Sequence, residues 1–218
     1  MNTRQERLAA FRAIDLYPVI SSEFTNGRPV LDILQAIADG GAKIVQLREK
    51  NRSKLEIYHL AEQYRKITDR YRMLLMVNDH IDVAMAVEAD GVHLGQDDLP
   101  LPAAVRLNTE LLLGNSTHNL DEALAAIRDG ADCINIGPIF PTNTKNVSYP
   151  AVGIAEMRRI AKQVPVPFSV MGGIKAGHIP ELLQAGACRI AMVTEITQAE
   201  DVTSRVKALR QLWQRNNS

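Results

Sequence analysis

Two acidic residues follow two consecutive apolar segments, and their spacing makes them the strongest candidates for chemistry. The run 73–77 ends at Asn78 and Asp79, and the next run, 91–94, leads into a polar turn that contains Asp98. If both runs are neighbouring strands of a parallel sheet, their ends lie about 5 Å apart, so the two carboxylates can meet. Such a pair suits Mg²⁺, which proteins hold through one or two carboxylates together with substrate phosphates and water. The alternative is that Asp79 caps a helix and Asp98 is a solvated loop residue.

A basic segment follows another apolar run. The sequence Gln-Leu-Arg-Glu-Lys at 46–50 ends the run 43–47. Side chains alternate along an extended chain, so Arg48 and Lys50 are expected to face one side and Glu49 the other. Arg48 can grip a phosphate through its planar guanidinium group, and Lys50 adds a point charge. The alternative is a surface salt-bridge network with Glu49.

Hydroxyl groups and a third cation occur together in the segment Thr142-Asn143-Thr144-Lys145. Prolines at 138, 141 and 150 restrict this segment on both sides, so it can bind an oxyanion at a low entropic cost. A plain polar turn is the alternative. Gly173 and the pair Val193-Thr194 follow the last two predicted strands, where barrels commonly bind phosphate. A double glycine at 172–173 is also ordinary in turns.

No nucleophile with an adjacent general base is predicted. Ser116 has only His118 near it in sequence as a possible general base. We therefore interpret Ser116 as a hydroxyl that hydrogen-bonds a ligand. His93 lies inside a predicted strand and is interpreted as a core imidazole or as one that supports a ligand-binding group. The remaining histidines, at 59, 80 and 178, are interpreted as surface or capping residues.

Alternating strand and helix segments must position these groups. Strands are predicted over 16–21, 43–47, 73–77, 91–94, 111–114, 132–136, 168–171 and 189–193. Helices are predicted over 30–39, 53–72, 81–87, after the prolines at 100 and 102, and over 119–128, 152–163, 176–185 and 201–214. Three similar glycine breaks, at 39–42, 129–132 and 185–187, are typical of helix-to-strand turns.

Eight strands, each followed by a helix, favour a single-domain (β/α)₈ TIM barrel over residues 16–218. An open doubly wound sheet is the alternative, and it would require two of the short strands, most plausibly the fourth and fifth, to be wrong. Residues 1–15 are interpreted as a helical N-terminal extension that lies outside the barrel.

Composition narrows the class of protein. The 218 residues include 25 Lys plus Arg and 25 Asp plus Glu, and this balance argues against a partner that is nucleic acid or a membrane surface. No apolar run approaches the roughly 18 residues of a membrane helix, and the N-terminus lacks an apolar signal core. Cys133 and Cys188 lie in apolar segments and are predicted to be reduced core thiols of a cytoplasmic protein.

Taken together, these segments resemble the thiamine phosphate synthase family. The matching segments are Gln-Leu-Arg-Glu-Lys at 46–50, Val-Asn-Asp at 77–79, Asp-Gly-Val-His-Leu-Gly-Gln-Asp-Asp at 90–98, Ser-Thr-His at 116–118, Gly-Pro-Ile-Phe-Pro-Thr-Asn-Thr-Lys at 137–145 and Gly-Gly-Ile at 172–174. The resemblance extends from Leu16 to Thr197. It departs from the family at Thr194, where serine is usual, and at 146–149, which lack the usual acidic and alanine-rich segment.

The resemblance implies a transferase with two small-molecule substrates, 4-amino-5-hydroxymethyl-2-methylpyrimidine diphosphate and 4-methyl-5-(2-phosphooxyethyl)thiazole, and with Mg²⁺ as cofactor. It implies that Asp79 and Asp98 hold Mg²⁺. The residues that it places on the pyrimidine diphosphate are Gln46, Arg48, Lys50, Asn78, Ser116 and Lys145. The residues that it places around the thiazole phosphate are Thr142, Thr144, Gly173, Val193 and Thr194. It also implies a dissociative substitution, in which Arg48, Lys50, Lys145 and Mg²⁺ offset the charge of the departing pyrophosphate and no protein nucleophile takes part.

Two other functions fit a similar barrel. Thiazole tautomerases typically lack the second acidic segment, and many carry His after the glycine that ends the sixth strand, where this chain has Pro138. A non-catalytic barrel that binds thiamine precursors would have no need of the metal pair. The sequence leaves the oligomeric state open, because the outer helices of a barrel are amphipathic in monomers and dimers alike.

Overall fold

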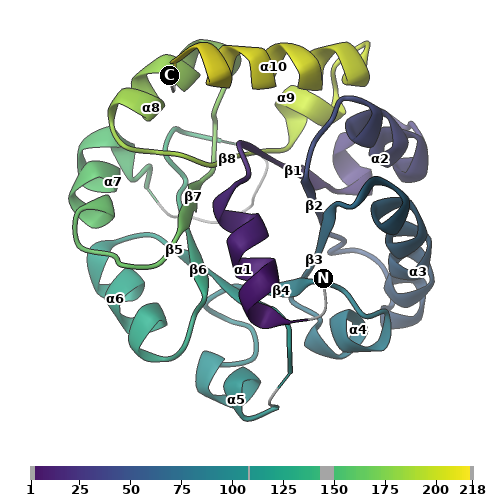
Figure 1. Ribbon diagram of the computed structural model, residues 1–218, viewed down its shortest axis with the longest axis horizontal. Coiled ribbons are helices and arrows are strands. Elements are labelled where there is room, and N and C mark those ends of the chain that lie inside the picture. Colours follow the sequence, from purple (N-terminus) through teal and green to yellow (C-terminus); the bar gives the residue numbers. More distant parts are fainter. Residues whose placement is uncertain (1–2, 108, 143–149, 217–218) are drawn as a thin grey trace.

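The computed structural model is a closed barrel of eight parallel strands surrounded by helices (Figure 1). It describes residues 3–107, 109–142 and 150–216. The strands, which pair in sequence order and close through β1 and β8, are β1 (Leu16–Ile20), β2 (Ile44–Leu47), β3 (Leu74–Asn78), β4 (Gly91–Leu94), β5 (Leu112–Thr117), β6 (Cys133–Ile136), β7 (Phe168–Val170) and β8 (Ile190–Met192). The TIM barrel predicted from the sequence is therefore confirmed, and the open doubly wound alternative is wrong.

The helices surround the strands, and all but the first, which covers one end of the barrel, form the outer ring. They are α1 (Arg4–Arg12), α2 (Val30–Asp39), α3 (Lys54–Tyr71), α4 (Ile81–Ala86), α5 (Leu101–Arg106), α6 (Leu120–Arg128), α7 (Gly153–Ala161), α8 (Ile179–Gln184), α9 (Thr194–Thr197) and α10 (Val202–Asn216), with 3₁₀ turns η1 (Ser22–Phe24) and η2 (Ala176–His178). The sequence did not predict α9 or η1, and it merged η2 with α8. Within the described ranges, no helix is long and apolar enough to cross a membrane.

The strands form because they are rich in apolar residues and are buried on both faces, and the polar residues among them, such as Gln46, Asn78 and His93, are buried as well. β3 is buried at all five positions, and its register pairs Met76 with Gly91 of β4. At the predicted glycine breaks, Gly41, Gly130 and Gly186 have φ values of +86°, +103° and +97°, which glycine adopts without steric strain. These turns return the chain to the start of each strand, so the polar segments that follow the strands gather at the opposite end of the barrel.

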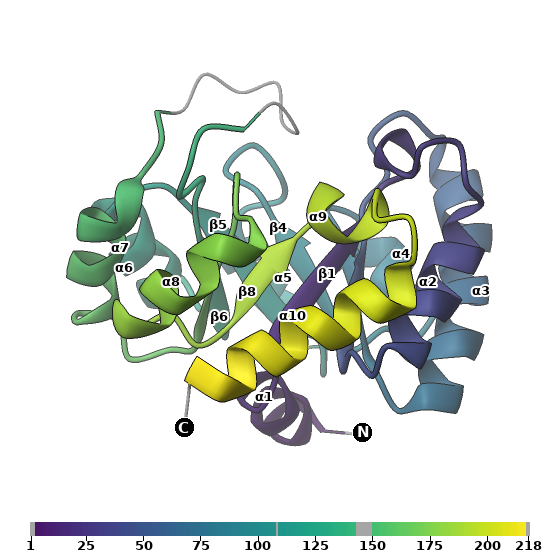
Figure 2. The same cartoon turned by 90° about the horizontal axis from the view of Figure 1, so that it is seen from above.

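Helix α1 covers the end of the barrel away from those segments (Figures 1 and 2). A capping box between Thr3 and Glu6 begins the helix, and its buried Phe11 packs edge-on against Tyr17, with ring centroids 6.0 Å apart. Both residues belong to the apolar cluster that fills the lower barrel, together with Ile14, Ile44, Leu74, Met76, Leu112, Cys133 and Ala191. The helix therefore seals this cluster from water.

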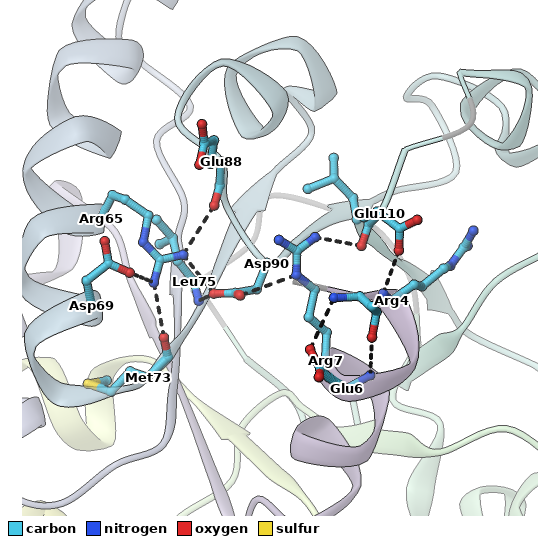
Figure 3. Close-up of polar contacts among 12 residues, drawn as sticks. Arg4, Glu6, Arg7, Arg65, Asp69, Met73, Leu75, Glu88, Asp90 and Glu110 are labelled. Atoms are coloured by element: carbon cyan, nitrogen blue, oxygen red, sulfur yellow. Dashed lines mark hydrogen bonds and ion pairs between the residues drawn. The ribbon is translucent and has the colours of Figure 1, made fainter. Parts of the chain in front are cut away.

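Buried charges attach α1 to the barrel (Figure 3). Arg7 Nε lies 3.5 Å from Asp90, whose carboxylate also accepts hydrogen bonds from Arg65 Nη1 and the Leu75 amide, both at 2.8 Å. Arg7 Nη1 donates to the carbonyl of Glu110 at 2.6 Å. Asp90 is thus a buried carboxylate that the protein itself satisfies.

The two cysteines differ from their prediction in one respect. Both are free thiols, as expected, and Cys133 is buried inside the barrel. Cys188 is exposed, because β8 begins only at Ile190 and leaves Cys188 in the preceding turn. The prediction of a core thiol at Cys188 is therefore wrong.

Candidate active site

The two predicted acids lie together at the ends of β3 and β4. Asp79 directly follows β3 and has a left-handed φ of +64°, with its amide donating to the His93 carbonyl at 2.9 Å. Lys50 Nζ lies 2.5 Å from Asp79 Oδ2. Asp98 folds back over its own turn and accepts a hydrogen bond from the Gly95 amide at 2.6 Å. A strained, non-glycine φ at such a point is typical of functional sites.

The acids also perturb each other. Burial and the neighbouring Asp98 carboxyl raise the pKa of Asp79. Burial opposes ionisation of Asp98 too, but hydrogen bonds from the Asp79 carboxyl and the Gly95 amide lower its pKa. The opposite directions of the two shifts show that the two carboxyl groups are close enough to affect each other's ionisation.

The alternative interpretations of this pair are wrong. Helix α4 begins at Ile81 after His80, and no side chain caps it, so Asp79 is not a helix cap. Asp98 is partly buried and engaged rather than a free loop residue. No group of three or more His, Cys, Asp or Glu side chains that could hold a metal occurs among the described residues. Two carboxylates alone would leave most ligands of a cation such as Mg²⁺ to be supplied by phosphates and water.

The basic segment behind β2 faces this pair. Glu49 is buried and accepts hydrogen bonds from the Ser22 amide at 2.9 Å and the Ser22 hydroxyl at 2.6 Å, and it pairs with Arg52 at 3.5 Å. Lys50 instead contacts Asp79. The salt-bridge network of Arg48 and Lys50 with Glu49 is therefore not formed. The Arg48 side chain is partly exposed.

Further polar side chains lie inside the barrel, below the ends of β2, β3 and β4. Asn78, the last residue of β3, is buried and pairs with His93 in the sheet register. Gln46 lies deeper, where its Nε2 donates to the Tyr17 hydroxyl at 2.9 Å. Burial raises the pKa of Tyr17, so this hydroxyl stays neutral and orients the amide of Gln46.

Ser116 contacts a histidine that the sequence did not connect with it. Strand β5 continues to Thr117, so Ser116 lies within the strand rather than after it. Its Oγ is 2.9 Å from His93 Nε2, and Gly114 makes room for the imidazole, since a Cβ there would lie 2.7 Å from His93 Nδ1. His118 lies beyond the end of β5 and contacts Glu122 at 2.7 Å. The barrel thus creates a serine–histidine pair between neighbouring strands.

The loops after β6, β7 and β8 lie on the other side of the opening. Gly173 has a φ of +64°, and a Cβ there would lie 2.5 Å from the Pro141 carbonyl oxygen, so only glycine fits against this loop. Thr142 is half-buried, and Thr194 begins α9 directly after Val193. The predicted residues Thr144 and Lys145 lie outside the described residues.

Comparisons with known proteins identify the family of this chain. The family model described as "Thiamine monophosphate synthase" matches residues 16–196. A thiamine-phosphate synthase of Shouchella clausii is 44% identical over 89% of this chain and 93% of its own. One of Chloroflexus aurantiacus is 43% identical over 90% of this chain and 91% of its own.

Solved structures give the same result. Thiamine phosphate pyrophosphorylase from Pyrococcus furiosus superposes with a TM-score of 0.88 at 32% identity, covering 95% of this chain and 100% of that one. A 3-hexulose-6-phosphate synthase superposes with a TM-score of 0.66 at 19% identity over 91% of this chain and 99% of that one. The second likeness concerns the barrel fold alone.

Proposed function

Because the chain belongs to the thiamine monophosphate synthase family, we propose that it is a transferase that joins 4-amino-5-hydroxymethyl-2-methylpyrimidine diphosphate to 4-methyl-5-(2-phosphooxyethyl)thiazole. The products are thiamine phosphate and pyrophosphate. The charged, phosphorylated substrates do not cross membranes freely, and the proposed location of the reaction is the cytoplasm.

The observation that carries the proposal is the contact of Lys50, Asp79 and Asp98 at the ends of three consecutive strands. Two ionised carboxylates in contact repel each other, so a bound cation would stabilise the pair. A diphosphate with Mg²⁺ supplies the cation and the further oxygen ligands at once. Lys50 then remains within reach of the diphosphate.

Each predicted residue has a place in this proposal. Asp79 and Asp98 would hold Mg²⁺, which neutralises charge on the diphosphate when bound. The groups proposed to contact the pyrimidine diphosphate are Gln46, Arg48, Lys50, Asn78, Ser116 and Lys145. Those proposed to surround the thiazole phosphate are Thr142, Thr144, Gly173, Val193 and Thr194. His93 would position the Ser116 hydroxyl, because it accepts or donates the hydrogen bond between them.

The proposed chemistry is a dissociative substitution. The bond between the pyrimidine methylene carbon and the diphosphate oxygen breaks first, and its electron pair leaves with pyrophosphate. The thiazole nitrogen then donates its lone pair to the cationic carbon. Arg48, Lys50 and Lys145 stabilise the charge that grows on the leaving group, which is the usual source of a large rate effect. The Ser116–His93 pair serves as a hydrogen-bonding group, since this route uses no protein nucleophile.

The test is a pyrophosphate-release assay with both substrates and Mg²⁺, with thiamine phosphate identified by mass. Omitting the thiazole phosphate or chelating the metal is expected to abolish product formation. Folded protein that forms no thiamine phosphate under these conditions would contradict the proposal. The tautomerase alternative predicts that the same mixture releases no pyrophosphate and forms no thiamine phosphate. Pro138 and the intact Asp98 turn favour the synthase.

A further inference from the structure

Glu195, which follows Thr194 in α9, joins the two loops that are proposed to bind the thiazole phosphate. Its Oε1 accepts a hydrogen bond from the Ala176 amide at 3.2 Å, in the loop after β7. Its Oε2 lies 3.2 Å from Lys175 Nζ, and Arg205 of α10 pairs with Oε1. The side chain of Glu195 is only 10% exposed. One carboxylate therefore links α9, the start of η2 and α10.

The sheet itself holds these two loops together weakly. In the described ladder, β7 and β8 share one Cα pair, Val170 with Ile190, whereas β2 and β3 share four. Beyond that pair, the side chain of Glu195 connects the segment after β8 to Lys175 and Ala176, which follow β7. Figure 2 shows α9 lying at the upper end of the barrel, close to the end of α10 from which Arg205 extends.

The opposite side of the β7 loop is already fixed. Gly173 packs against the Pro141 carbonyl, and the Phe140 ring lies on His178, with centroids 4.1 Å apart. His178 Nδ1 accepts a hydrogen bond from the Lys175 amide at 3.1 Å. The loop is thus held from the β6 side by packing and from the β8 side by Glu195.

The charge of Glu195 is stable in this setting. Burial opposes its ionisation, but the Ala176 amide, Lys175 and Arg205 together lower the pKa of Glu195. The carboxylate is therefore ionised at neutral pH and balances two cations. These charges line a surface hollow of about 610 Å³ whose wall also includes Thr194.

We propose that Glu195 is a positioning residue for the thiazole-phosphate half of the site. Its contacts hold the Gly173 backbone and the Thr194 hydroxyl at the spacing that one phosphate requires. The inference rests on the proposed function, because it takes Gly173 and Thr194 as phosphate contacts. Glu195 itself touches no reacting atom. It acts through Ala176, Lys175 and Arg205.

Electrostatics and positioning predict opposite effects of Glu195→Gln, which makes the variant informative. Removing a negative charge beside a phosphate should strengthen phosphate binding if charge alone matters. If Glu195 positions the loops, the variant should weaken phosphate binding instead. The neutral amide would face Lys175 and Arg205, its contacts with them would weaken, and the loops that follow β7 and β8 would move apart. We expect KM for the thiazole phosphate to rise about tenfold, about 1.4 kcal/mol, while KM for the pyrimidine diphosphate changes less than twofold. The Ki of inorganic phosphate as a competitor of the thiazole substrate should rise in parallel.

Matched variants separate this role from folding and from charge. Glu200→Gln removes an exposed acid from the same hollow and should leave both KM values unchanged. Lys175→Met keeps the bonds of Glu195 to Ala176 and Arg205 and should raise the thiazole KM less than threefold. Glu195→Asp keeps the charge with a shorter reach and should give an intermediate rise.

Three results would overturn the inference: an unchanged or lower thiazole KM in Glu195→Gln, equal rises in both KM values, or a Lys175→Met effect as large as that of Glu195→Gln. Simple loss of folded protein would lower the apparent kcat with both KM values intact, and this result would also count against positioning. Failure of the proposed function would differ from all of these, since the unmodified protein would then form no thiamine phosphate.

Discussion

Replacing Asp98 by Asn should separate catalysis from stability. The Asn carbonyl oxygen can still accept the 2.6 Å hydrogen bond from the Gly95 amide, so the turn 95–98 keeps its shape. The variant removes one of the two carboxylates proposed to hold Mg²⁺, and it leaves Asp79 paired with Lys50. Its effect should therefore be chemical rather than structural.

The variant is expected to lower kcat strongly, whereas the free energy of unfolding should not fall. Removing one group that stabilises transition-state charge typically costs about 10²- to 10³-fold in kcat, or about 2.7–4 kcal/mol, and we expect a loss of that size. Two like charges about 4 Å apart repel by at most about 4 kcal/mol near a protein surface. Asp98 is partly exposed and Lys50 lies nearby, so screening reduces the relief to about 1 kcal/mol or less. The free energy of unfolding should be unchanged or slightly higher.

The assay compares Asp98→Asn with Asp97→Asn. Asp97 is exposed in the same turn, so its variant removes the same charge away from the Asp79 contact, and its rate should stay within about twofold. Pyrophosphate release is measured over a range of Mg²⁺ concentrations, and unfolding is measured in urea. Equal, small losses in both variants would refute the metal assignment. Parallel losses of rate and stability in Asp98→Asn would show that the carboxylate only holds the turn.

Three further variants test other parts of the molecule. Lys145→Ala should lower kcat by about 10²-fold or more if the ammonium group stabilises the departing pyrophosphate, and an unchanged rate of pyrophosphate release would make it a surface lysine. Gly173→Ala should raise the thiazole-phosphate KM at least about tenfold, because its Cβ would collide with the Pro141 carbonyl at a φ of +64°; unaltered steady-state kinetics would disprove this. Asp90→Ala leaves Arg7 and Arg65 without their buried partner, so urea unfolding should show a loss of about 3–5 kcal/mol with both KM values retained. A loss below about 1 kcal/mol would mean that water replaces the carboxylate.

The barrel was predictable because its signals are local. Each strand is a short apolar run, and glycine marks three of the turns that return the chain to the next strand. The incorrect predictions also concern short segments. Helix α9 has only four residues and no side-chain cap, so it carries no detectable periodicity. Cys188 was assigned to an apolar segment because Ala187 precedes it and Ile190 follows closely, although the strand begins only at Ile190.

The acid pair was predictable for a different reason. Consecutive parallel strands end at the same edge, so Asp79 and Asp98 were expected to meet without any knowledge of side-chain geometry. The Ser116–His93 contact could be predicted only with knowledge of how two strands pair. It depends on His93 pairing with Gly114 in the register of β4 and β5, and on the missing Cβ at Gly114. A sequence pattern does not fix the register of one strand against the next, so this contact could not be derived.

Asp90 and Asp79 are acids of the same type that lie at opposite ends of the barrel and have different neighbours. Asp90 precedes β4 and lies under α1, where two arginines and a backbone amide satisfy its carboxylate. Asp79 follows β3 at the opposite end, where its neighbours are one lysine and a second carboxyl group. A buried carboxylate whose donors all come from the protein gains nothing from a ligand, whereas a carboxylate pressed against another one does. A cation would therefore gain most free energy by binding at the open end of the barrel, where the substrates can supply its remaining ligands.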